Sequence, residues 1–130
     1  MFRGSGFTPW VIRTWTHSAW GHCGVLLMIE GVPMVIEARF SGGVALHCLY
    51  NRTADEPDIY PTGRAVDVAS AIAHAGDTYS IKDALLAAID KAGHHAGWEC
   101  AELAAWLLGV DHASKGWTPQ SLLAHLSGER

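Results

Sequence analysis

The sequence predicts an α+β fold in which a small antiparallel sheet packs against helices. Strand-like segments lie in the first half of the chain, at residues 22–29, 32–38 and 44–50. After residue 63, apolar residues instead recur at helical spacing, and residues typical of helix ends flank them. No repeat, low-complexity tract or linker interrupts the 130 residues. We therefore expect a single domain spanning residues 1–130.

Turn signals separate the strand-like segments. Glu30-Gly31 fits a two-residue hairpin after segment 22–29, and Ser41-Gly42-Gly43 is a second break. Segment 22–29 is apolar on both faces, which predicts a central strand covered by helices. Pro33 cannot donate to a ladder, so it indicates a strand start or an edge. Before these strands, we expect an ordered entry segment with one short strand at residues 10–14.

Four helices are expected in the second half of the chain. Segments 64–75, 80–91 and 98–108 each place apolar residues on one stripe. A fourth helix should begin at Thr118-Pro119, where a capping residue precedes proline at the first helical position. Residues 51–63 hold two prolines and several polar residues, which is typical of a surface loop.

Composition excludes several classes of protein. The net charge of −4 is modest and no basic run is present, so we expect no nucleic-acid partner. No apolar run approaches the roughly 20 residues of a membrane span, so we expect no integral membrane segment. No apolar signal-peptide core follows Met1. The expected compartment is the cytoplasm, although a phage particle or release on lysis would leave the same trace.

The cysteines do not suggest a disulfide framework or a metal site. Cys23, Cys48 and Cys100 are an odd number, and none forms a Cys-x-x-Cys pair. His47-Cys48 and His94-His95 are adjacent pairs and do not have the spacing of metal ligands. We therefore expect neither a metal nor another cofactor.

A thiol, an imidazole and a carboxylate are the parts of an activated cysteine nucleophile, and Cys100, His22 and Glu37 supply them. If the first hairpin turns at Glu30-Gly31, opposing residues sum to 61, and Gly24 faces Glu37. His22 and Glu37 then project from the same face as diagonal neighbours, within reach of each other. A slip of one residue would place them on opposite faces. In this register Glu37 can orient the His22 ring.

Cys100 is expected in the first turn of its helix. The positive end of the helix dipole there favours a thiolate, and the unpaired N–H groups could receive an oxyanion. The alternative is a buried structural cysteine, because Cys100 also lies on an apolar stripe. Glu102 is interpreted as a first-turn carboxylate without a catalytic role, and Cys23 as a core residue on the face opposite His22.

Several short motifs resemble the circularly permuted papain-like hydrolases of the NlpC type, in the YiiX-like branch. The histidine precedes the cysteine, the reverse of the order in papain. The similarity covers roughly residues 12–125 and rests on the following motifs: Ile12-Arg13-Thr14-Trp15-Thr16, Gly21-His22-Cys23-Gly24-Val25, Val35-Ile36-Glu37-Ala38, Gly43-Val44, Cys100-Ala101-Glu102-Leu103 and Thr118-Pro119-x-x-Leu122. Ala101 departs from the pattern, because serine is frequent there.

The resemblance implies a permuted papain-like fold and a thiol hydrolase with Cys100 as nucleophile, His22 as base and Glu37 as the orienting residue. Its substrate would be an amide bond in a peptide, isopeptide or cell-wall peptide, or an ester. Trp20 and Trp98 flank the motifs and could line a substrate cleft, although core packing explains them equally well. Two alternatives stay open: a non-catalytic structural or binding module, such as a phage tail or assembly component, and a lipid acyltransferase. The oligomeric state stays open as well.

Overall fold

The computed structural model describes residues 1, 20–39, 42–51, 57–77, 99–111 and 116–128. These residues form a small α+β structure with a three-stranded antiparallel sheet and three helices, as the sequence predicts. The elements are β1 (Val25–Ile29), β2 (Val32–Arg39), β3 (Gly43–Cys48), the 3-10 turn η1 (Leu49–Asn51), α2 (Val68–Ala73), α4 (Cys100–Leu107) and α5 (Pro119–Gly128). The strand expected at 10–14 and the helix expected at 80–91 lie outside the described residues.

The first hairpin has the predicted register. Val25 pairs with Ile36, so opposing residues sum to 61. Glu30 and Gly31 both have positive φ angles, 49° and 79°, which suits the tight turn of a two-residue hairpin. In the second hairpin, Glu37 lies opposite Ala45. The sheet therefore fixes which side chains of the three strands share a face.

The position of β1 differs from the expectation. Among the described strands the order is β1-β2-β3, so β2 is central and β1 lies at an edge. Leu26 and Met28 are 39% and 59% exposed. One apolar face of this segment is therefore exposed, so the expectation of a central strand covered on both faces is wrong. Pro33 is the second residue of β2, consistent with a strand start.

The helix ends follow from local capping. α2 begins at Val68, later than the expected residue 64, because Asp67 acts as N-cap and accepts a hydrogen bond from the Ala69 N–H. α4 begins at Cys100, inside the expected segment 98–108. α5 begins at Pro119, the predicted first helical position. No helix in the described part of the chain is long and apolar enough to cross a membrane.

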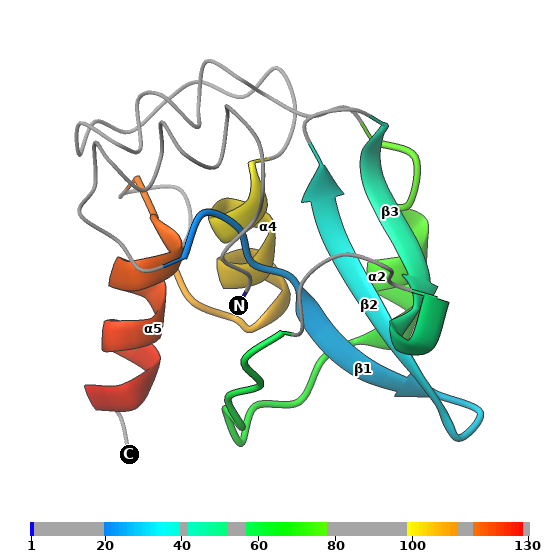
Figure 1. Ribbon diagram of the computed structural model, residues 1–130, viewed down its shortest axis with the longest axis horizontal. Helices are drawn as coiled ribbons and strands as arrows, with labels where there is room; N and C mark the ends of the chain where they lie inside the picture. The colour runs from blue at the N-terminus through cyan, green and yellow to red at the C-terminus, as the bar shows by residue number, and fades with distance from the viewer. Residues whose placement is uncertain (2–19, 40–41, 52–56, 78–98, 112–115, 129–130) are drawn as a thin grey trace.

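The three helices pack beside the sheet and share one hydrophobic core with it. Figure 1 shows α4 between the sheet and α5, and α2 behind β2 and β3. The segment after α2 is tied to β3, because Gly76 N–H donates to the Val44 carbonyl and Val44 N–H donates to the Asp77 carbonyl. The shared core draws on the sheet, α2, α4 and α5 and includes Val25, Ile36, Ala38, Val44, Ala71, Leu103, Ala104, Leu107, Leu122 and Leu126. This packing brings the first turn of α4 against β2.

Candidate active site

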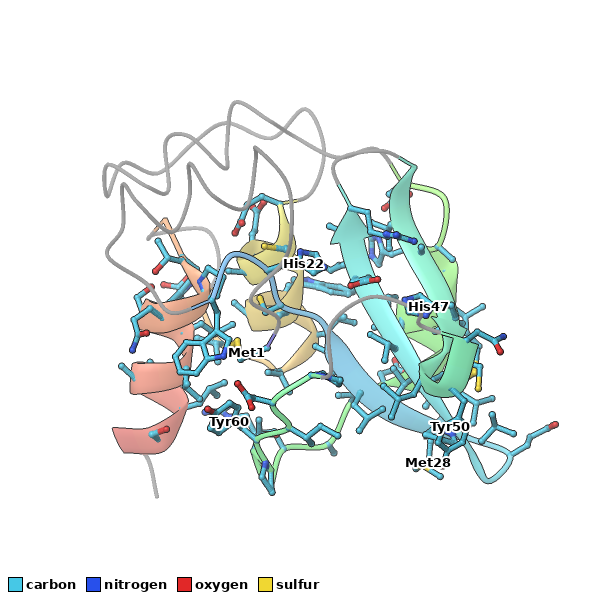
Figure 2. The ribbon with its side chains drawn as sticks, in the orientation of Figure 1. Met1, His22, Met28, His47, Tyr50 and Tyr60 are labelled. Carbon is cyan, nitrogen blue, oxygen red and sulfur yellow. The ribbon has the colours of Figure 1, made fainter. Side chains whose placement is uncertain are left out.

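His22 and Glu37 meet as the hairpin register predicts. His22 Nε2 lies 2.5 Å from Glu37 Oε2, and the Glu37 side chain is fully buried while that of His22 is 18% exposed. A carboxylate only accepts hydrogen bonds, so with Glu37 ionised the proton sits on Nε2. Figure 2 shows His22 between α4 and the sheet. Glu37 therefore fixes the orientation and the tautomer of this ring.

Gly24 makes this approach of the two strands feasible. A Cβ added there would lie 3.0 Å from the Glu37 Cβ and 2.9 Å from the Ile36 carbonyl oxygen. Both distances are shorter than ordinary van der Waals contact, and the second involves backbone that cannot rotate away. A glycine two residues after His22 is therefore required by the position of Glu37 beneath it.

Cys100 lies at the first position of α4 and contacts His22. The two side chains interact, since each shifts the pKa of the other, and because Nε2 binds Glu37, Nδ1 is the ring nitrogen that remains for the thiol. Burial alone would lower the pKa of His22, but the hydrogen bonds with Cys100 and Glu37 outweigh it and raise the pKa to about 9. The ring is therefore protonated at neutral pH.

The surroundings of the thiol oppose its ionisation. The hydrogen bond with Cys23 and burial raise the pKa of Cys100 well above its usual range, and His22 offsets them only in part. Only 3% of Cys100 and 1% of Cys23 is exposed. The expectation that the helix N-terminus holds a thiolate is therefore wrong for this structure, in which a neutral thiol faces an imidazolium–carboxylate pair at neutral pH.

Glu99 explains why the helix N-terminus does not help the thiol. Its side chain caps α4 by accepting from the N–H groups of Ala101, at 3.1 Å, and Glu102. Cys100 Sγ donates to the same carboxyl group at 3.7 Å. Burial and the neighbouring Cys100 raise the pKa of Glu99 well above its usual range. The two N–H groups expected to receive an oxyanion therefore already have an acceptor.

Glu102 has the structural role expected of it. It stands at the third position of α4 and completes a capping box, its side chain accepting from the Glu99 N–H at 3.5 Å. It is buried, with 5% of its surface exposed, so it belongs to the end of the helix.

We predict that removing the Cys23 thiol makes Cys100 easier to ionise. Cys23→Ala deletes the largest contribution that raises the pKa of Cys100, so the pH midpoint of Cys100 alkylation by iodoacetamide should fall. Cys48→Ala is the matched control, because it removes a free thiol that is not among the causes of that shift. Equal midpoints in both variants would contradict the role given to Cys23.

A cavity of about 310 Å³ lies beside this group. Cys23 lines it, together with apolar residues of α4 and α5 and the segment 57–62. His22, Glu37 and Cys100 are not among its lining residues. Within the described part of the chain, Cys23 is therefore the residue that both lines the cavity and interacts with Cys100.

The two tryptophans proposed for a substrate cleft have different outcomes. Trp20 Nε1–H donates to Asp58 Oδ2 at 3.0 Å, and its ring packs edge-on against Tyr60 with centroids 5.9 Å apart. Asp58 and Tyr60 line the cavity, so Trp20 supports its wall. Trp98 lies outside the described residues.

The sequence interpretation did not predict three features of this site: the cap that Glu99 forms on α4, the interaction of Cys23 with Cys100, and the contact of His47 with Glu37. His47 Nε2 lies 2.7 Å from Glu37 Oε1. Each ring points at a different oxygen of Glu37, and within the described residues no three His, Cys, Asp or Glu side chains are placed to hold a metal ion. The signal for His47 was its position two residues along β3 from Ala45, which lies opposite Glu37.

Comparison with known proteins adds no relative: no family model, curated protein or solved structure matches this chain. The resemblance of the motifs to permuted papain-like hydrolases therefore stays a prediction.

Proposed function

We propose that the chain is a cysteine hydrolase of amide or ester bonds, with a permuted papain-like fold and a Cys100–His22–Glu37 site. The observation that supports this most is the chain of interactions: Cys100 and His22 shift each other's pKa, and His22 Nε2 lies 2.5 Å from Oε2 of the buried Glu37. Nucleophile, base and orienting carboxylate come from α4, the segment before β1, and β2. This is the arrangement that nucleophilic catalysis by a thiol requires.

The reaction follows from these positions. Loss of one proton from the Cys100–His22 pair leaves a thiolate beside an imidazolium that Glu37 stabilises. The sulfur attacks the substrate carbonyl carbon, and His22 gives its proton to the departing amine or alcohol, which leaves a thioester. His22 then takes a proton from water, hydroxide attacks the thioester, and the acid is released with the thiol restored. Because the pKa of His22 is about 9, the rate should rise with pH toward that value.

A second candidate is a non-catalytic binding or structural module with the same fold. The observations that favour it are the 3% exposure of Cys100, its raised pKa and the capping of the first-turn N–H groups by Glu99. A thiol held neutral and covered is typical of a core cysteine.

A substrate panel distinguishes the two candidates. The chain is incubated at pH 7 and pH 9 with activated anilides of short peptides, an isopeptide, and esters of short and long fatty acids. We expect turnover of at least one class, faster at pH 9, and its loss in Cys100→Ala. Absence of turnover across the panel at both pH values would support the non-catalytic module.

A further inference from the structure

A second histidine approaches Glu37 from the other neighbouring strand. In the β2–β3 register Val35 lies opposite His47 and Glu37 opposite Ala45, so His47 is a diagonal neighbour of Glu37 on the same face. His22 has the mirrored diagonal position on the β1 side. Figure 2 shows the two rings on opposite sides of β2, His22 near α4 and His47 on β3.

The contacts of His47 fix the carboxylate. Its Nε2 donates to Glu37 Oε1 at 2.7 Å, while His22 uses Oε2, so each carboxylate oxygen has an imidazole partner. The other ring nitrogen of His47, Nδ1, lies 3.4 Å from the Cys48 carbonyl oxygen. Glu37 itself is fully buried, and His47 is 22% exposed. The carboxylate therefore cannot rotate without losing a bond to one of the two rings.

We propose that His47 is a positioning residue of the site, which holds Glu37 in place and takes a share of its negative charge away from His22. This inference rests on the proposed function, because it assigns a role toward the same base. It extends the site from three residues to four and adds β3 to the elements that supply them.

The charged groups around Glu37 determine whether loss of the His47 side chain raises or lowers the pKa of His22. Among the described residues they are His22 before β1, His47 on β3, Arg39 on β2, with its Nε 3.8 Å from Oε1, and Cys100 on α4 behind His22. Arg39 is 56% exposed, so solvent screens its share. Without the His47 N–H, the carboxylate becomes a stronger acceptor for His22. The protonated form of His22 is then favoured further, and the free base is scarcer at neutral pH.

The test measures His22 directly, by NMR titration of its ring signals in the full chain. In His47→Leu, we expect the pKa of His22 to rise above its value of about 9, by roughly one unit. His47→Gln, whose amide can donate to Glu37 Oε1, should restore the wild-type value. A His22 pKa in His47→Leu that is unchanged or lower would overturn the proposal.

Two controls separate this role from a structural one and from the proposed function. His74→Leu removes a comparable pair, with Nδ1 2.6 Å from Asp77 Oδ2, and should leave the His22 titration unchanged. If His47→Leu does not fold, the wild-type chain decides: coupled titration of the two ring signals supports the proposal, and independent titration overturns it. None of these readouts needs a substrate, so a failed hydrolysis assay refutes the function without deciding the coupling.

Discussion

Cys100→Ser is expected to lower hydrolysis by about 10⁴-fold or more while the domain stays folded, because a serine hydroxyl ionises far less readily than a thiol. The hydroxyl can still donate to Glu99, which accepts from the thiol at 3.7 Å, so the fold keeps this contact. Activity on a substrate found in the panel and the melting temperature are measured together.

Variants of His22 and Cys48 test the same prediction further. His22→Ala should lose activity to a similar extent, and the double variant should be no worse than either single one, because nucleophile and base act as a unit. Cys48→Ser is the matched control and should retain activity. A structural Cys100 gives the opposite pattern, in which Cys100→Ser costs about 1–3 kcal/mol of stability and His22→Ala leaves any hydrolysis intact.

Glu37→Gln is expected to lower turnover by about 10²- to 10⁴-fold, because the amide keeps the volume of the side chain but loses the charge that orients and stabilises the imidazolium. Glu37 is fully buried between two imidazoles, so we also expect a stability loss of about 1–3 kcal/mol from its imperfectly paired amide. Full activity in Glu37→Ala would show that Glu37 is not the third member of the site.

The pH dependence of stability gives a second measure of Glu37. The folded-state pKa of His22 is raised from 6.5 to about 9, so its contribution is complete below pH 6.5 and is lost as the pH rises to about 9. Its upper limit is about 3 kcal/mol. In Glu37→Gln part of this contribution is absent, so the stability gap to the wild type should narrow between pH 6.5 and pH 9. A constant gap would contradict the ion pair.

The parts of the site that depend on nearby residues could be predicted from the sequence. Glu30-Gly31 determined the register of the first hairpin, and the register placed His22 beside Glu37. The position of Cys100 followed from the apolar stripe of its helix. These inferences needed only turn chemistry and residue periodicity, which act over a few residues.

The rest depended on contacts that periodicity does not encode. Glutamate is not a favoured N-cap, so Glu99 was not expected to occupy the first-turn N–H groups. The contact between Cys23 and Cys100 joins the segment before β1 to α4 and follows only from tertiary packing. His47 required the register of the second hairpin as well as the first. The sequence therefore indicated the three reactive groups but not the environment that sets their ionisation.

Acylation of Cys100 is tested most directly by the mass of the intact chain, quenched during turnover of an activated acyl ester at pH 9. We predict an added acyl mass that maps to Cys100, is released by hydroxylamine as a thioester, and is absent in Cys100→Ser. Turnover without any acyl adduct on Cys100, or an adduct on Cys23 or Cys48 instead, would contradict it.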